Sequence, residues 1–453
     1  MSRPLVSLIT VNFNGRSHLG PFLDSVLAQD YPQDQVELIV VDNGSSDGSV
    51  ESVQAHYPSV KVLTNEANLG FAKANNQGAE SARGRYLALL NNDVRLERTW
   101  VRRMVACLEN TPGDVVCAGS MILNWDGSSV DFGGGTMAFN GVGFQTHAHA
   151  PVGEKLEYPD TILFACGCAL MVERDVYLKA GGFDEDYFAY LEDVDFGWRL
   201  WVLGFRVAFC SEAVVYHRHN ATSSQFDSHR KAVLIERNAL YSVFKNYDDA
   251  LLAAVLPPTL LLAVKRIAVR SGIPREEFSF VPRVTPAASA PAFQLLQTDE
   301  SHLSAFKRVW RDEGPVVALE KSARKGWELA RRTLTHRPRR SASTAPLEPM
   351  RPIQRDAYAT VVAIEDFIEH LPELVTKRQR IQAARRRADD EILGMFGTPF
   401  KAPEQAPKHR RGYESAHETT LRSLGIRDYF AERTETEEGA APRAAVRDFH
   451  SLS

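Results

Sequence analysis

The chain reads Tyr86-Leu87-Ala88-Leu89-Leu90-Asn91-Asn92-Asp93-Val94 at the point that decides its fold. The apolar run before residue 91 predicts a buried strand, and it stops at two amides and one carboxylate. In open α/β sheets, ligands bind beyond the carboxyl ends of the strands. We therefore expect Asn91, Asn92 and Asp93 to lie at a binding site. A single carboxylate there suits Mg²⁺ or Mn²⁺, which proteins hold through one or two carboxylates and the phosphates of the substrate.

The first ninety residues alternate between strand and helix patterns. Residues 5–11 and 36–41 are apolar and β-branched, and each run ends at a turn rich in Asn, Asp, Ser and Gly. Residues 18–29 carry apolar side chains at helical spacing between them. This alternation predicts a parallel sheet with helices on both faces.

Asp42 begins the turn after the second predicted strand, in the run Asp42-Asn43-Gly44-Ser45-Ser46-Asp47-Gly48-Ser49. These residue types form turns and cap helices, so one interpretation is purely structural. The other is that Asp42, next to Thr10 and Asn12 of the first strand, accepts a hydrogen bond from a nucleobase. The position at a strand's carboxyl end favours the second interpretation.

A loop at residues 65–70 turns into a predicted helix that runs to residue 83. Asn75 and Asn76 lie inside this helix, although asparagine is a poor helix former. A polar site beside the helix would explain this local cost.

A second acidic stretch, Leu191-Glu192-Asp193-Val194-Asp195, opens a predicted helix that ends at Gly204. Acidic residues are favoured at a helix N-terminus by its exposed amides and dipole, so capping is the alternative explanation. Three acids in four positions exceed what capping requires. We therefore expect at least one of them to face a site or a cation.

His217 follows an apolar strand pattern over residues 213–216. A histidine at a strand end is more often structural than a metal ligand, but its place after the acidic helix leaves both interpretations open for His217. His219 carries less weight. The pattern over 225–250 is polar and helical. We expect four of its residues to face whatever lies beside the site: Arg230, Lys231, Arg237 and Asn238.

Composition limits the classes of function. With 453 residues, the chain exceeds one ordinary domain, and its 44% of hydrophobic residues suffice for a sizeable core. A formal net charge of −4 gives no electrostatic case for a nucleic-acid partner. The N-terminus enters the first strand without a secretory signal pattern, and sparse cysteines in apolar contexts predict reduced thiols in a cytoplasmic protein. We interpret Cys166-Gly167-Cys168 as strand packing, because a zinc site needs a second pair.

The remaining sequence is less informative. Residues 111–165 predict short strands, an acceptor-side sheet and a mobile loop, and Gly133-Gly134-Gly135 lacks the Lys-Ser/Thr of a phosphate loop. The run 251–269 is the most apolar in the chain, and an interfacial membrane contact and a buried helix pair are both open. A basic cluster over 377–387 is either a solvated face or attracted to anionic phospholipid. We expect five regions: a catalytic domain at 1–250, an apolar helical segment at 251–272, a Pro/Ser-rich and basic helical linker at 273–350 (helix at 304–334), a basic helical segment at 351–397, and a disordered tail at 398–453.

Four motifs occur in one order: Asp42 to Gly48, Asn68-Leu69-Gly70-Phe71-Ala72 with Asn75-Asn76, Leu89 to Asp93, and Glu192-Asp193 with Arg199 and Gly204. Together they resemble the inverting family 2 glycosyltransferases of GT-A fold, in particular the bacterial rhamnosyltransferase-like and galactofuranosyltransferase-like members. The resemblance covers about residues 4–220. It implies a Rossmann-like nucleotide-sugar-binding domain with a mixed central sheet, followed here by a mainly helical C-terminal region.

The resemblance also implies roles. A nucleotide-diphosphate-sugar donor would lie against the following residues: Thr10, Asn12, Asp42, Asn68, Gly70, Asn75, Asn91 and Asn92. Asp93 matches the last acid of the family's Asp-x-Asp metal motif, whose first acid is Asn91 here, and His217 matches a downstream histidine that joins the metal shell of Mn²⁺ or Mg²⁺. Asp193 matches the catalytic base, and Glu192 is its neighbour near the acceptor.

The chemistry follows from the residues as well. Glycosyl transfer from a diphosphate needs a cation on the leaving group and a base at the acceptor hydroxyl, for which Asp193 is the candidate. dTDP-rhamnose is the first expected donor, and UDP-galactofuranose or UDP-N-acetylglucosamine are the others. The expected acceptor is a cell-surface glycan or a lipid-linked saccharide, reached from the cytoplasm with peripheral membrane contact. A nucleotidyltransferase and a catalytically degenerate, donor-binding scaffold at a membrane are the alternatives.

Overall fold

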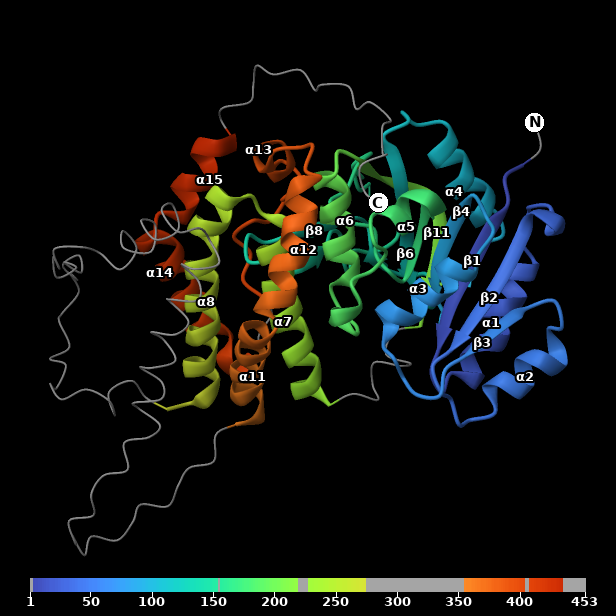
Figure 1. Cartoon of the computed structure of the whole chain (residues 1–453), viewed down its shortest axis with the longest axis horizontal. Helices are drawn as coiled ribbons and strands as arrows, with labels where there is room; N and C mark the ends of the chain where they lie inside the picture. Colours follow the sequence, from blue (N-terminus) through green and yellow to red (C-terminus); the bar gives the residue numbers. More distant parts are fainter. Residues whose placement is uncertain (1–2, 154, 219–226, 274–353, 404–406, 435–453) are drawn as a thin grey trace, which may run out of the picture.

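A computed structural model describes residues 3–153, 155–218, 227–273, 354–403 and 407–434 (Figure 1). The predicted helix at 304–334, most of the linker at 273–350 and His219 lie outside the described residues. Figure 1 shows a sheet flanked by α1 to α5 on one side of the molecule, and a group of long helices on the other.

A nine-stranded sheet forms the core of the N-terminal half, in the order β3-β2-β1-β4-β10-β6-β11-β5, with β7 paired to β6. β1, β2, β3 and β4 are mutually parallel, as the alternation predicts, whereas β10 is antiparallel to both β4 and β6. The sheet is therefore mixed. The strands are β1 (Val6–Asn12), β2 (Val36–Asp42), β3 (Lys61–Thr64), β4 (Tyr86–Asn91), β5 (Val94–Leu96), β6 (Val115–Asn124), β7 (Val130–Phe132), β10 (Ala169–Glu173) and β11 (Arg206–His217).

Strand direction brings distant polar residues to one edge of this sheet. β6 and β11 are parallel to each other, and β6 runs in the same direction as β4 because both are antiparallel to β10. The carboxyl ends of β1, β2, β4, β6 and β11 therefore meet at one edge, together with the amino end of β10. Asn12, Asp42, Asn91 and His217 lie at this edge.

Seven short or medium helices accompany the sheet: α1 (Arg16–Leu27), α2 (Ser49–His56), α3 (Phe71–Ser81), α4 (Trp100–Glu109), α5 (Arg174–Lys179), α6 (Glu192–Val202) and the 3₁₀ helix η2 (Glu185–Tyr187). A further 3₁₀ turn, η1 (Gln33–Gln35), precedes β2, and a small two-stranded sheet pairs β8 (Gly135–Met137) with β9 (Gly143–Gln145). Their apolar faces are buried: Leu19, Phe22 and Leu23 of α1 are at most 3% exposed.

The region 111–165 contains the short strands β7, β8 and β9, as predicted, and also one long strand that was not predicted. It contributes β6, ten residues long and buried along nine of them, which lies between β10 and β11 in the middle of the sheet. A strand covered on both faces loses the alternation of polar and apolar residues that marks half-buried strands, which explains the weak pattern. Residues 206–217 also form one strand rather than two, with a register shift between Cys210 and Val214.

The helical region consists of α7 (Ser228–Asn246), α8 (Asp249–Ser271), α11 (Arg355–Glu369), α12 (Leu371–Ala383), α13 (Asp389–Leu393), α14 (Pro407–Ser423) and α15 (Ile426–Thr434). α7 packs against α6 of the sheet domain and against α11, α12 and α8. The helical C-terminal region is thus attached to the helix that begins with Glu192 and Asp193.

α8 corresponds to the apolar run at 251–269. Among the described residues, it is the one helix long and apolar enough to cross a membrane, and 44% of its most apolar window is buried inside the protein. Leu251, Leu252 and Val255 are buried, whereas Leu261 and Val264 are 40% and 52% exposed. A buried helix pair therefore accounts for one face of α8, and contact of the other face with a membrane stays a prediction.

The basic cluster at 377–387 was expected to be a solvated face or to attract lipid. Arg380 and Arg386 are exposed, whereas the other members make contacts within the protein. Lys377 pairs with Asp184 and Asp186, and Arg378 donates to the carbonyls of Phe244 and Tyr247 at 2.6 Å each. The side chains of Arg385 and Arg387 likewise donate to the carbonyls of Asn246 and Phe205, whereas Arg386 bonds to the carbonyl of Val202 through its backbone amide. The side chains of Lys377, Arg378, Arg385 and Arg387 thus attach α12 and the loop after it to the rest of the fold.

Residues 407–434 form α14 and α15, within the region 398–453 that composition marks as disordered. Tyr413 and Leu421 of α14 are fully buried, and Lys265 of α8 donates to the carbonyl of Ala416 at 3.3 Å. Few apolar residues are enough here, because α8 offers an apolar face that α14 covers.

Candidate active site

Asn12, at the end of β1, is the centre of a network that holds the strand ends together. Its side-chain amide donates to the carboxylate of Asp42 at 2.8 Å and to the hydroxyls of Ser45 and Ser49 at 3.1 and 2.9 Å. Its side-chain oxygen accepts from Asn92 at 2.8 Å. Asn12 is fully buried, so its hydrogen-bonding capacity is spent on the fold.

Asp42 and Asn43 fix the turn after β2. The second carboxylate oxygen of Asp42 accepts from the backbone of Ser45 at 2.9 Å. Asn43 donates to the carbonyl of Gly70 at 3.1 Å and to the side chain of Asn68 at 3.2 Å. The motif containing Asn68 and Gly70 thus lies against the turn that follows β2. We call Asn12, Asp42, Asn43 and Asn92 the turn network.

Three other residues of the predicted donor site have different surroundings. Thr10 lies within the sheet and its buried hydroxyl has no hydrogen-bond partner. Asn75 is fully buried in α3, where its amide donates to the carbonyl of Phe71 at 2.9 Å. Asn91 is partly exposed at the end of β4, and its backbone donates to the carbonyl of Cys168 at 2.9 Å.

The predicted metal ligands meet. His217 Nε2 lies 3.4 Å from the carboxylate of Asp93, and His217 Nδ1 lies 2.9 Å from the carboxylate of Asp131 in β7. Asp93 and Asp131 are 7% and 6% exposed at their side chains. The sequence analysis missed Asp131, although an acid between two apolar residues, Val130 and Phe132, was a usable signal.

The carboxylates of Asp93 and Asp131 strongly affect the pKa of His217. Burial by itself lowers the pKa of His217, but the hydrogen bonds to Asp131 and Asp93, and their negative charges, outweigh it and raise the pKa to about 10. Burial raises the pKa of Asp93, yet the hydrogen bond and charge of His217 turn the net shift downward. Without a competing cation, the imidazole is thus positively charged between two carboxylates.

The side chains of Asp93, His217 and Asp131 are of the kinds that bind a divalent cation, but not all of them can contact one. A histidine that donates one ring nitrogen to a carboxylate and offers the other to a metal is a recurring arrangement, in which the carboxylate fixes the ring. Asp131 lies where such a carboxylate would lie, which would leave Asp93 and His217 to contact an ion. Within the described ranges no group of three or more His, Cys, Asp or Glu side chains is arranged to hold one.

Asp193 is held by backbone amides at the amino end of β10. Its two carboxylate oxygens accept from Gly167 and from Val194, each at 2.8 Å. Because Cys168 accepts from the backbone of Asn91, Asp193 is linked to the strand end that carries Asp93. Cys166-Gly167-Cys168 was expected only to pack a strand, but the amide of Gly167 also donates a hydrogen bond to Asp193. The thiols of Cys166 and Cys168 form no disulfide, as predicted.

Glu192 lies next to Asp193 and is 6% exposed. One of its carboxylate oxygens is buried without a hydrogen-bond partner. Burial raises the pKa of Glu192 well above its ordinary value, and the charge of Asp193 raises it further. Burial also raises the pKa of Asp193, although the amides of Gly167 and Val194 oppose the rise. The two amide donors favour the ionised form of Asp193, whereas burial and the neighbouring charge both favour the neutral form of Glu192.

Asp195, the third acid of the stretch, has a structural part. It is fully buried and accepts from Arg199 at 3.1 Å and from Asn246 at 2.8 Å, and it lies 3.1 Å from Lys245. The acidic run thus divides into a pair at the sheet edge and one residue that joins α6 to α7.

Comparison with known proteins shows which family this part of the chain matches. Residues 7–179 match the family model described as glycosyl transferase family 2. The chain is 28% identical over 252 residues to the N-acetylglucosaminyl-diphospho-decaprenol L-rhamnosyltransferase of Mycobacterium tuberculosis (strain ATCC 25618 / H37Rv). This alignment covers 50% of this chain and 81% of the relative. It is 30% identical over 178 residues to the putative teichuronic acid biosynthesis glycosyltransferase TuaG of Bacillus subtilis (strain 168), covering 38% and 64%.

Among solved structures, the mannosyltransferase PcManGT from Pyrobaculum calidifontis, in complex with GDP-Man and Mn²⁺, aligns with a TM-score of 0.40. The alignment covers 81% of this chain and 88% of that one, at 14% sequence identity. This likeness is too distant to bear on activity. The family match and the named sequence relatives lead to one conclusion: the chain contains a glycosyl transferase family 2 domain, and it is a glycosyltransferase.

Proposed function

We propose that the chain transfers a sugar from a nucleotide-diphosphate-sugar to an acceptor hydroxyl in one displacement that inverts the anomeric carbon. The observation that supports this most is the meeting of two pairs at one sheet edge. Asp93 with His217 forms one pair, and Asp193 with Glu192 forms the other. The first suits a leaving diphosphate and the second suits an attacking hydroxyl.

Asp93 and His217 Nε2 would hold a Mn²⁺ or Mg²⁺ ion, with Asp131 fixing the imidazole ring from its other nitrogen. When bound, the ion would neutralise charge on the departing diphosphate. Asp42 and Asn91 would contact the donor directly. The carboxylate of Asp42 can accept more hydrogen bonds than the two it has, and Asn91 is partly exposed at the end of β4. Asn12, Asn92 and Gly70 would shape the donor site without contacting the nucleotide.

Asp193 would act as the general base. The acceptor hydroxyl loses its proton to Asp193 while its oxygen forms a bond to the anomeric carbon. The bond from that carbon to the diphosphate oxygen breaks, and the nucleoside diphosphate leaves with the electron pair. Glu192, whose pKa is raised by burial and by Asp193, would donate a hydrogen bond to the acceptor in its neutral form and hold it beside Asp193.

The names of the sequence relatives support a choice of donor and acceptor to propose. The mycobacterial relative is named for transfer of L-rhamnose to N-acetylglucosaminyl-diphospho-decaprenol. We therefore propose dTDP-rhamnose as the first donor and a lipid-linked or cell-surface saccharide as the acceptor. UDP-galactofuranose and UDP-N-acetylglucosamine are the next donors to test.

The first experiment is a thermal-shift panel of nucleotide-sugars with and without Mn²⁺ or Mg²⁺. We expect one donor to raise the melting temperature only when the metal is present, and Asp93→Ala to abolish this rise. Asp126→Ala, which removes an exposed acid in the turn after β6, is the matched control and should keep it. A panel without any shift for the wild type would contradict the proposed donor class.

The second experiment tests the base. With the donor found in the panel, release of nucleoside diphosphate in the presence of a lipid-linked saccharide should fall about 10²- to 10⁴-fold in Asp193→Asn, the usual contribution of a general base. Donor binding should be unchanged in the same variant. Full turnover by a folded Asp193→Asn protein would remove Asp193 from the mechanism.

A further inference from the structure

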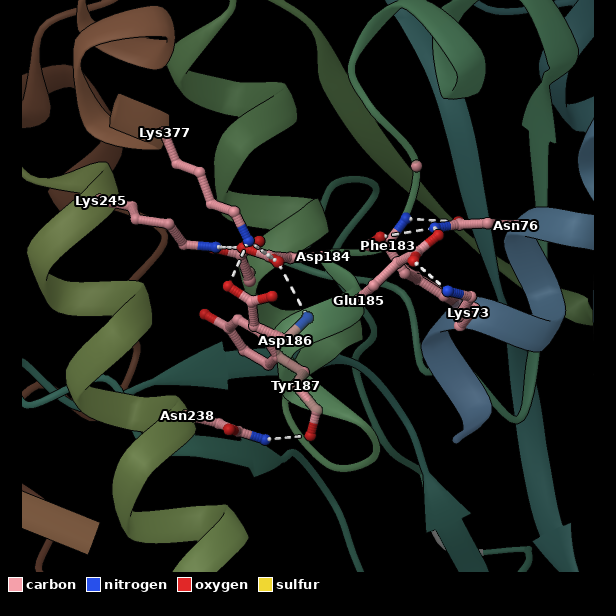
Figure 2. A network of polar contacts seen from close by, with 12 residues as sticks. Lys73, Asn76, Phe183, Asp184, Glu185, Asp186, Tyr187, Asn238, Lys245 and Lys377 are labelled. Atoms are coloured by element: carbon pink, nitrogen blue, oxygen red, sulfur yellow. Dashed lines mark hydrogen bonds and ion pairs between the residues drawn. The ribbon is translucent and has the colours of Figure 1, made fainter. Parts of the chain in front are cut away.

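The segment Phe183–Leu191 lies between the sheet domain and the helical region and contacts both. It directly precedes Glu192 and Asp193, which we call the catalytic pair. We call residues 183–191 the bridging segment. It contains η2 and ends at Leu191, which precedes α6. In Figure 2, Asn76 and Lys73 of α3 approach this segment from the sheet side, while Lys245, Lys377 and Asn238 approach it from the helical region.

The backbone of the bridging segment is strained. Phe188, Tyr190 and Leu191 have φ angles of 61°, 70° and 64°, a region that bulky side chains rarely adopt. The amide of Ala189 donates to the carbonyl of Tyr187 at 2.6 Å, which closes a tight γ-turn around Phe188. Such a conformation persists only where surrounding contacts hold it, and it concentrates at functional sites.

The sheet domain holds the segment at two points. The side chain of Asn76 donates to the carbonyl of Phe183 at 2.8 Å and accepts from its amide at 3.0 Å. The carbonyl of Phe188 accepts from the first amides of α3, those of Phe71 and Ala72, at 2.6 and 3.2 Å. Gly70 permits this approach, because a Cβ at its position would lie 2.7 Å from that carbonyl oxygen.

The helical region holds the strained part through Asn238 of α7. Its side-chain amide lies within hydrogen-bond distance of three carbonyls, those of Tyr187 at 3.0 Å, Ala189 at 3.0 Å and Tyr190 at 2.7 Å. Asn238 is fully buried, and its side-chain oxygen accepts from the neighbouring Arg237 at 3.1 Å. One side chain thus satisfies the carbonyls on both sides of the γ-turn.

Charged pairs support the start of the segment. Lys245 of α7 and Lys377 of α12 both pair with the buried carboxylate of Asp184, and Lys377 also lies 2.6 Å from Asp186. Burial raises the pKa of Asp184, but the charges of both lysines outweigh it and hold the pKa well below its ordinary value. Asp184 is therefore ionised and paired with two helices of the C-terminal half.

We propose that Asn238 is a positioning residue for the catalytic pair and that α7, through it, is part of the catalytic apparatus. Leu191 is the last residue in the left-handed region and the N-cap of α6, so its backbone sets the direction in which α6 begins. If the carbonyls of Ala189 and Tyr190 lose their donor, the segment relaxes toward ordinary backbone angles, and Glu192 and Asp193 turn with it. The inference rests on the proposed role of Asp193 as the base.

The test compares Asn238→Ala with Leu240→Ala in the full chain. Leu240 is also buried in α7, but it lies two residues further along the helix and therefore on a different face. Both variants lose buried contacts, whereas only Asn238→Ala releases the bridging segment. We expect kcat for nucleoside diphosphate release to fall about 100-fold in Asn238→Ala, as for a displacement of about 1 Å at a reacting group. Donor binding should stay unchanged, and Leu240→Ala should retain kcat.

Hydrogen exchange supplies a readout that needs no substrate. The amides of Gly167 and Val194 are bonded to the carboxylate of Asp193 and report where that side chain lies. They should exchange faster in Asn238→Ala and remain protected in Leu240→Ala. Unchanged protection of both amides in Asn238→Ala, together with wild-type kcat, would overturn the proposal.

The two proposals fail in different ways. If Asp193→Asn is inactive and Asn238→Ala is normal, the base stands and the positioning role is wrong. If Asp193→Asn is fully active while Asn238→Ala shows faster exchange, the segment is held as proposed but does not carry the base. Should Asn238→Ala not fold, Asn238→Ser keeps one donor, and it should show a lower kcat and faster exchange of the two amides than the wild type.

Discussion

The turn network and the bridging segment lie on the same site and are held in opposite ways. The turn network draws its partners from the first ninety-two residues, with Asn12 bonded to Asp42 and Asn92. The bridging segment depends on partners from both halves of the chain, with Asn76 before it and Asn238 and Lys377 after it. The first uses neutral amides and one carboxylate, whereas the second uses strained backbone and buried ion pairs.

This difference has consequences for stability and for catalysis. Contacts among neighbouring strands form together with the sheet, so the turn network should survive changes in the helical region. The bridging segment should not, because two of its lysine partners come from α7 and α12. The donor-binding side and the acid side of the site are therefore expected to respond separately to mutation.

The largest effect should come from Lys245→Met. Lys245 is 1% exposed and contacts the buried acids Asp184 and Asp195. Removing one partner of a buried ion pair costs about 3–5 kcal/mol, because it leaves a charge uncompensated. Urea unfolding should show this loss in the free energy of unfolding. Lys377→Met is the control, since its side chain is 31% exposed and should cost less; an equal loss in both would contradict the ranking.

Asp131→Ala should weaken metal binding on the other side of the site. Loss of the carboxylate that fixes a ligating histidine typically costs 10- to 100-fold in metal affinity. The affinity for Mn²⁺ can be followed through the electron paramagnetic resonance signal of the free ion, with nucleoside diphosphate present. Asp126→Ala should bind Mn²⁺ like the wild type. Unchanged affinity in Asp131→Ala would show that His217 does not need this partner.

Glu192→Gln should change the pH dependence of stability by a smaller amount, since among the described residues its side chain makes no hydrogen bond that the substitution removes. Burial and Asp193 raise the pKa of Glu192 in the folded state above its unfolded value, so the folded protein holds this proton more tightly. Its contribution to stability is present below the unfolded pKa of about 4.3 and is lost as pH rises through the folded pKa. Melting temperatures across this range should therefore fall less steeply with pH in Glu192→Gln. An identical slope in both proteins would mean that Glu192 is ionised in the fold.

The smallest effect should come from Lys73→Ala. Lys73 and Glu185 form a 3.4 Å ion pair on the sheet side of the bridging segment, and both side chains are nearly half exposed. Exposed pairs contribute about 0.2–1 kcal/mol. Urea unfolding of Lys73→Ala should lie within that range of the wild type. A larger loss in the free energy of unfolding would mean that α3 holds the bridging segment more strongly than the helical region does.

Several parts of the site were predictable because their signals are local. The end of β4 at Asn91, Asn92 and Asp93 follows from an apolar run that stops at polar residues. The acidic start of α6 follows from three acids before a helical pattern. What could not be predicted was the use of each residue: Asn12 and Asn92 bond to each other, and Asp195 joins α6 to α7 instead of facing the site.

The sequence by itself determined the strand and helix alternation up to residue 90, because periodicity and turn chemistry act between near neighbours. Its motifs also carried the resemblance to the family, from which the proposed roles of Asp93, Asp193 and His217 come. Only the tertiary structure decided that Asp131 meets His217, that Gly167 holds Asp193, and that Asn238 holds the bridging segment. These contacts depend on the order of strands in the mixed sheet and on the docking of α7. Both are set by the burial of apolar faces over the whole chain, which no short stretch of sequence records.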